Sequence, residues 1–238
     1  MEGIVKIDRR RNYLIVLDTE TCNTPKDDKG QLDTTSGLVY DIGWAVVDKW
    51  GNVYLTRSFI IRDIFYDKEL MNSAYYKQKV PKYEEDIKAG TRVVVDWYQA
   101  IMCLRTDMEM FETNIVIAHN APFDYRVMNS TERYLTKSKY RYALPYGTEV
   151  WDSVKMATDT IGQQKTYRKF CEENGFMTKH KVPRPKMTAE VLTKFFNGDL
   201  EYTEEHTALE DVLIETQIFA KCYAQHKKMN KLLFANQA

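Results

Sequence analysis

The chain has 238 residues, and its 34 Lys and Arg balance 34 Asp and Glu, so the formal net charge is zero. A composition of 44% hydrophobic and 29% charged residues is typical of globular proteins and argues against disorder. The apolar runs, such as residues 14–17, are far shorter than the ~20 residues of a membrane span. A neutral chain is also not expected to bind nucleic acid by bulk charge.

The first half of the chain reads mainly as strands. A short, continuous apolar run at residues 13–18 predicts a strand buried on both faces, and the polar segment 23–37 predicts a loop. Residues 38–47 and 53–61 flank a turn with Gly51 and predict a hairpin. Residues 67–90 predict helical pieces broken near Pro81, and residues 93–109 predict a helix.

The second half alternates strands and helices. We expect strands at residues 114–118 and 149–152, and helices at 122–135, 153–161, 163–173 and 189–196. A last helix is predicted by apolar spacing, with Thr207 and Glu210 as a capping box and one face made of Leu209, Val212, Leu213, Thr216, Ala220 and Tyr223. This order predicts an α/β fold with a central mixed sheet, antiparallel hairpin strands plus parallel strands, flanked by helices, in a single domain at 1–238.

The four cysteines, at positions 22, 103, 171 and 222, form no CxxC pair. The N-terminus carries no export signal, so we expect a cytoplasmic protein with reduced thiols and no membrane association.

Asp18 and Glu20 end the first predicted strand. Alternate residues of a strand point to one face, so both carboxylates can reach one metal ion. The same Asp-x-Glu spacing recurs at 67–69, 107–109 and 199–201, so the spacing alone is weak. The apolar strand before Asp18 distinguishes this pair, because α/β proteins place their sites at the carboxyl ends of central strands.

Two further segments pair a histidine with an aspartate five residues later. His119 and Asp124 follow the strand at 114–118, and His206 and Asp211 begin the last helix. Histidine is the usual general base near neutral pH. The equal spacing leaves open which histidine is the base.

Together the three segments resemble the motifs of the DEDDh 3′→5′ exonucleases, a DnaQ-like, proofreading-subunit-like family. They read Leu17-Asp18-Thr19-Glu20-Thr21, Ala118-His119-Asn120-Ala121-Pro122-Phe123-Asp124 and His206-Thr207-Ala208-Leu209-Glu210-Asp211, and the resemblance covers about residues 13–225. Thr21 is followed by Cys22 and Asn23 where the family often has Thr-Gly.

The resemblance implies a ribonuclease-H-like fold and a metal-dependent 3′→5′ exonuclease that releases nucleoside 5′-monophosphates. Asp18, Glu20, Asp124 and Asp211 would hold two divalent ions, Mg²⁺ or Mn²⁺, with His206 as general base. The residues expected to contact substrate are Thr19, Thr21, His119, Asn120 and Phe123. The implied substrate is single-stranded nucleic acid or the 3′ end of a duplex, and DNA is favoured over RNA. A polymerase or replication complex is a further expected partner.

A non-catalytic nucleic-acid-binding protein or polymerase accessory subunit is the alternative function, and another metal-dependent phosphoesterase is a third hypothesis.

Residues 126–194 hold 14 Lys and Arg against 7 Asp and Glu, a net charge of +7. We expect this segment, which includes the acid-free run 179–186, to contact the nucleic-acid backbone. Trp44 and Trp97 are expected in the core. The segment 62–110 carries no recognised motif.

Overall fold

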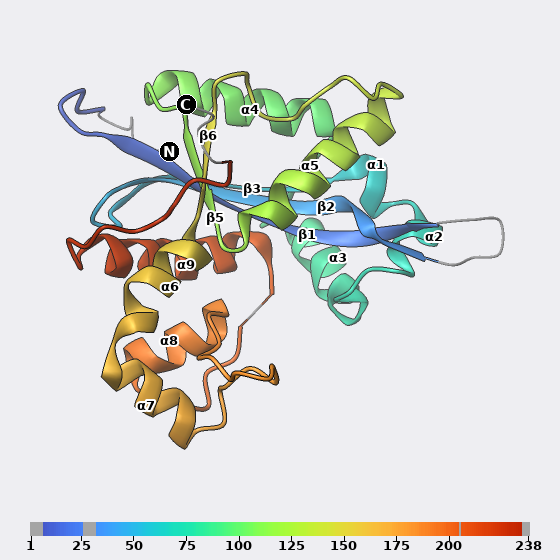
Figure 1. The fold of residues 1–238 in the computed structure, drawn as a ribbon. Coiled ribbons are helices and arrows are strands. Elements are labelled where there is room, and N and C mark those ends of the chain that lie inside the picture. Colours follow the sequence, from blue (N-terminus) through green and yellow to red (C-terminus); the bar gives the residue numbers. More distant parts are fainter. Residues whose placement is uncertain (1–6, 26–31, 205, 235–238) are drawn as a thin grey trace.

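The computed structural model describes residues 7–25, 32–204 and 206–234, which form a six-stranded sheet in the order β4-β3-β2-β1-β5-β6 (Figure 1). The strands are β1 (Tyr13–Pro25), β2 (Leu32–Asp48), β3 (Val53–Ile61), β4 (Val93–Val95), β5 (Ile115–Ala118) and β6 (Glu149–Asp152). The α-helices are α1 (Arg62–Phe65), α2 (Lys68–Met71), α3 (Val80–Ala89), α4 (Trp97–Met110), α5 (Ala121–Thr136), α6 (Ser153–Asp159), α7 (Lys165–Glu173), α8 (Ala189–Asn197) and α9 (Ala208–Tyr223).

The sheet is mixed, as predicted. β1, β2 and β3 pair antiparallel, whereas β5 runs parallel to β1, β6 to β5 and β4 to β3. β1 and β5 are parallel neighbours, with Val16 paired to Ile117, and β1 continues beyond the end of β5. The segments that follow Leu17 and Ala118 therefore lie side by side.

Helices cover both faces of the sheet, and β1 is buried between them. Leu14 and Val16 pack into the core on the side of α6 and α9, and Ile15 and Leu17 into the core on the side of α4 and α5. Figure 1 shows α4 and α5 above the sheet and α6 and α9 below it. The strand predicted at residues 13–18 is thus confirmed, with apolar side chains on both faces, but it continues to Pro25, so Asp18 and Glu20 lie within the strand and not at its end.

Two of the predicted boundaries are wrong. The expected loop at 23–37 is in large part strand, because the β1–β2 hairpin continues through the Thr24–Asp33 pairing; residues 26–31 lie outside the described residues. Residues 93–95 are not helical but form β4, which pairs with the end of β3. Three consecutive valines favour a strand, and Asp96 then caps α4 in a capping box with Gln99.

The last helix forms at Ala208–Tyr223, but its buried face differs from the predicted one. Leu213 is exposed, whereas Glu215 is buried. The predicted capping box is also wrong: Thr207 is the N-cap residue, but its hydroxyl donates to the Glu210 carboxylate instead of accepting a backbone N–H. The predicted face was chosen from apolar residues alone. A buried carboxylate such as Glu215 therefore could not be assigned to it, and Leu213 was assigned to it instead.

All four cysteines are free thiols, as expected, and three of them are buried. Trp44 and Trp97 are core residues. Among the described residues, none of the helices has the length and apolar character that crossing a membrane requires.

Candidate metal-dependent active site

The middle of β1, just beyond its pairing with β5, carries the first two acidic residues of the site. Asp18 is half-buried, and the Glu20 side chain is 7% exposed. Asp18 pairs with Gly43 of β2, and Glu20 with Asp41, before the strand register shifts at Thr21. Regular pairing up to this point keeps Asp18 and Glu20 on one face of the strand, as predicted.

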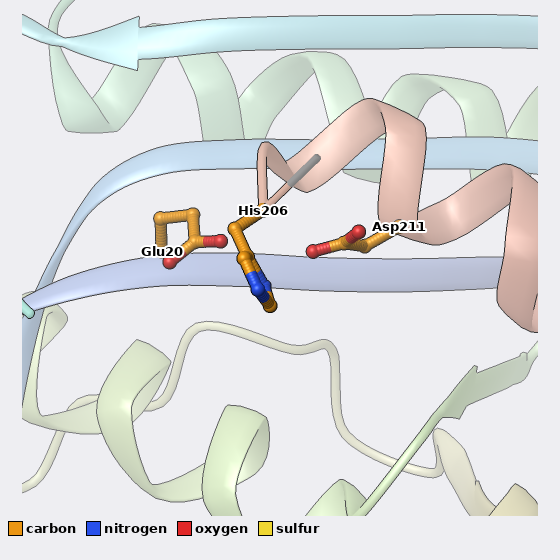
Figure 2. Close-up of side chains that lie close together, drawn as sticks. All are labelled: Glu20, His206 and Asp211. Carbon is orange, nitrogen blue, oxygen red and sulfur yellow. The ribbon is translucent and has the colours of Figure 1, made fainter. Parts of the chain in front are cut away.

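The start of α9 and the residue before its N-cap bring an aspartate and a histidine to this part of β1. Ligand atoms of Glu20, His206 and Asp211 all lie within 4.8 Å of one another (Figure 2). His206 has a left-handed backbone (φ 51°), and Asp211 lies in the first turn of α9. These three side chains, from positions 20 to 211, converge on one small volume.

Close packing of α9 on β2 makes this convergence possible. A Cβ atom on Gly43 would lie 2.7 Å from the backbone of Ala208 and Leu209, so only glycine allows the helix start to approach this far. The buried carboxylate of Asp41 accepts the Ala208 N–H at 3.3 Å. An acid at a helix N-terminus is stabilised by the unpaired N–H groups and the helix dipole.

Asp41 is itself held by side chains from the segment that carried no motif. The Tyr83 hydroxyl donates to Asp41 at 2.8 Å, and Arg92 forms an ion pair with it at 3.3 Å. Sequence reasoning missed this network, because Asp41 lies more than 40 residues from both of its partners and the three residues show no local pattern.

Asp124 reaches the site from the first turn of α5. It is 3% exposed and accepts a hydrogen bond from the Thr19 hydroxyl at 2.7 Å. This contact ties the start of α5 to the part of β1 that carries Asp18. The Thr19 side chain, a predicted substrate contact, therefore has a partner within the protein.

The predicted substrate contacts at 119–123 differ in their surroundings. Both ring nitrogens of His119 are hydrogen-bonded, Nδ1 to the Ser153 hydroxyl at 2.8 Å and Nε2 to the Met187 carbonyl at 2.6 Å. A carbonyl only accepts, so Nε2 carries a proton, and burial lowers the His119 pKa. Asn120 is exposed at the N-cap of α5 with φ 71°.

Phe123 and Thr21 are half-buried. The Arg126 guanidinium lies 5.7 Å from the centre of the Phe123 ring. The Thr21 carbonyl accepts the Tyr75 N–H at 3.5 Å.

Residues that sequence reasoning missed also face this site. The Tyr76 ring stacks on the His206 imidazole, with ring centres 4.2 Å apart and planes 13° apart. Lys79 is close enough to lower the pKa of His206 and of Glu20. Glu215 lies one helical turn after Asp211, a spacing that could have flagged it. No sequence signal pointed to Tyr76 or Lys79.

A cavity of about 500 Å³ adjoins the acidic cluster. Its lining includes the acids Asp18, Asp211 and Glu215, and also Lys186 and Thr188. The cavity therefore combines carboxylates with a cationic side chain from the basic segment. This combination suits a phosphate-bearing ligand bound next to metal ions.

Crowding of carboxylates dominates the electrostatics. Burial raises the pKa of Glu20 to about 9, with Asp211 as the strongest charged contributor. Burial also raises the pKa of Asp124 and of Asp211 to about 7. The pKa of Asp18 is raised by burial and then by Glu215. Such a cluster holds protons near neutral pH unless cations offset its charge.

Comparison with known proteins gives a likeness of fold. No family model matches the sequence, and a search of curated proteins gives no match. The nuclease domain of 3'hExo, a DEDDh family member, bound to rAMP, matches with a TM-score of 0.57 and 11% identity, covering 94% of this chain and 98% of that one.

Two nuclease structures with different nucleic acids also match. A 3'-exonuclease that recognises the histone mRNA stem-loop has a TM-score of 0.54 and 11% identity, over 95% of this chain and 69% of that one. E. coli Exonuclease I in complex with a dT13 oligonucleotide has a TM-score of 0.55 and 13% identity, over 91% of this chain and 42% of that one. This chain thus has the ribonuclease-H-like fold of DEDDh exonucleases, which confirms the predicted fold class.

Proposed function

We propose that this chain is a metal-dependent 3′→5′ exonuclease that hydrolyses the last phosphodiester bond of a nucleic-acid strand and releases a nucleoside 5′-monophosphate. The observation that carries the proposal is the convergence of Glu20, His206 and Asp211 within 4.8 Å, on the fold that DEDDh exonucleases share. Asp18 and Asp124 complete the set, because both lie close to Glu20. Glu20 raises the pKa of Asp18, and Asp124 raises the pKa of Glu20.

The residues present fit divalent cations. Carboxylate oxygens are the ligands that Mg²⁺ and Mn²⁺ prefer. Oδ1 of Asp211 is buried with no hydrogen-bond partner in the described part of the protein, and an unpaired buried oxygen is costly unless a ligand satisfies it. We assign Asp18, Glu20, Asp124 and Asp211 as the residues that would hold two such ions. Bound in this way, a metal pair supplies Lewis acidity to the attacking and leaving oxygens of phosphoryl transfer.

His206 has the properties of a general base in this proposal. Burial and the nearby Lys79 lower its pKa, so the imidazole is neutral at pH 7 and can accept a proton. Nδ1 lies 3.6 Å from the Glu204 carboxylate, which would stabilise the imidazolium that forms once the ring accepts a proton. His119 is unsuited to this role, because both of its ring nitrogens are engaged.

The substrate class follows from the charges beside the site. Lys186 lines the cavity, and it ends the acid-free run that begins at Lys179. Cations beside an acidic metal site would contact the phosphates upstream of the scissile bond. We therefore propose a single-stranded 3′ end or the 3′ end of a duplex as substrate, DNA favoured. The expectation of a polymerase partner gains no support from the compared structures.

One assay tests the proposal. 5′-labelled single-stranded DNA, RNA and mismatched duplex are incubated with the protein and Mg²⁺, Mn²⁺ or EDTA. We expect a ladder that shortens from the 3′ end only with metal. Asp18→Asn should abolish it, whereas Asp199→Asn, at the exposed Asp-x-Glu of residues 199–201, should not. Binding without hydrolysis under all conditions would refute the enzyme and favour a non-catalytic binding role.

A further inference from the structure

Glu215 is a buried acid that the proposed set of ligands does not use. Its side chain is 4% exposed, and it lies on α9 one turn, or about 6 Å of helix rise, beyond Asp211. It lines the same cavity as Asp18 and Asp211. Its carboxylate therefore faces the metal-binding side of α9 and not the apolar core behind it.

Within the described residues, Glu215 forms no ion pair with a lysine or arginine. The one hydrogen bond found there is from the backbone N–H of His119 to Oε2, at 3.2 Å. Its charged neighbours are acids: Glu215 is the strongest charged contributor to the raised pKa of Asp18, and Asp124 and Asp211 raise its own pKa. A single backbone N–H does not offset the cost of burying a carboxylate among other carboxylates.

On the basis of the proposed function, we propose that Glu215 is a further carboxylate ligand of the metal site, reaching the cation that Asp18 holds. A divalent cation would turn the mutual repulsion of Asp18 and Glu215 into shared attraction, since both acids border one cavity. The bond from the His119 N–H would orient the Glu215 carboxylate, in the way that outer hydrogen bonds orient metal ligands.

A purely structural role for Glu215 is the competing explanation, in which it only anchors the backbone at His119. Glu215→Gln separates the two roles, because the glutamine carbonyl can accept the same N–H while the negative charge is lost. A structural anchor tolerates this change. A metal ligand does not, since a neutral amide is a far weaker ligand for Mg²⁺ than a carboxylate.

The test is calorimetric titration of the purified full chain with MnCl₂, and with MgCl₂ as a second cation. For E215Q we expect metal affinity at least about tenfold weaker than in the wild type, and a smaller rise in Tm on adding Mn²⁺. Without metal, its Tm should equal or exceed that of the wild type, because a buried charge has been removed. Glu201→Gln, at an exposed position, is the matched control and should bind metal like the wild type.

Wild-type affinity in E215Q, with affinity lost in D18N, would overturn the role of Glu215 and leave the proposed function standing. Wild-type affinity in D18N as well would overturn the metal assignment of the proposed function itself. If E215Q does not fold, Glu215→Asp is the second test variant. It keeps the negative charge, but its side chain is shorter by one methylene, so the carboxylate lies farther from the proposed cation. Weakened metal binding in E215D would support the proposal, and unchanged binding would refute it.

Discussion

Gly43→Ala tests whether close packing of α9 on β2 sets the geometry of the site. The added Cβ would lie 2.7 Å from the backbone of Ala208 and Leu209, whereas ordinary contacts begin at 3.4 Å. One backbone must therefore move by about 0.7 Å, and neither can rotate away as a side chain would. We expect a loss of stability of about 1–3 kcal/mol from the strain.

The activity loss should exceed what this loss of stability explains. Asp211 lies on the first turn of α9, so it shifts with the helix start, away from Glu20 on β1. A displacement of about 1 Å in an active site can cost about 100-fold in rate. We therefore expect kcat to fall by about 10- to 100-fold at a temperature where the variant is fully folded.

The assay is steady-state hydrolysis of a labelled oligonucleotide, with circular dichroism to establish folding. Gly37→Ala is the matched control, since it lies on the same strand and its Cβ would meet side-chain atoms of Val127 and Thr21 at 3.2 Å or more. Those atoms can adjust, so G37A should keep near-normal kcat. Wild-type kcat and metal affinity in G43A would refute the reasoning that this contact positions Asp211.

Three further predictions concern the same site. Tyr76→Phe keeps the ring stacked on His206 and should keep kcat, whereas Tyr76→Ala should lower kcat up to about tenfold with little change in KM; equal kcat in both variants would contradict a positioning role. The raised pKa of Glu20, about 9 against an ordinary 4.5, means that the folded state binds more protons than the unfolded state between these values. In EDTA, urea unfolding should therefore show stability falling from pH 7 to pH 9, by at least about 1.4 kcal/mol, and Mg²⁺ should reduce the fall. Rising stability in EDTA would refute this reasoning. Charge reversal of the four cations Lys179, Lys181, Arg184 and Lys186 should weaken binding of single-stranded oligonucleotides and flatten its salt dependence, and an unchanged slope of log Kd against log salt would show that these residues do not contact phosphates.

Local patterns in the sequence were sufficient for the elements that carry the site. A continuous apolar run predicted β1, and a second one predicted β5, because burial on both faces leaves no room for polar residues in either strand. Pro122 and Asp124 marked the start of α5, and the apolar spacing after Thr207 marked α9. The acids that follow these apolar runs or begin these helices were therefore visible before any tertiary contact was known.

Local sequence patterns gave the wrong secondary structure where strand pairing between distant segments decided it. Residues 23–37 are polar and read as a loop, yet most of the described part is strand, because the two arms of the β1–β2 hairpin satisfy each other's backbone groups. Val93 was assigned to a helix, yet it pairs with Phe59 of β3. A strand partner so far away in sequence leaves no mark in the local pattern.

The sequence by itself determined which residues could do chemistry: acids directly beyond two apolar runs, and a histidine before the last helix. Only the tertiary structure decided how they are held. It brought Glu20, His206 and Asp211 within 4.8 Å of one another, engaged both nitrogens of His119, and added Tyr76 and Glu215 to the surroundings. The physical reason is that side-chain chemistry is a property of each residue, whereas proximity, burial and hydrogen-bond partners arise only when distant segments pack together.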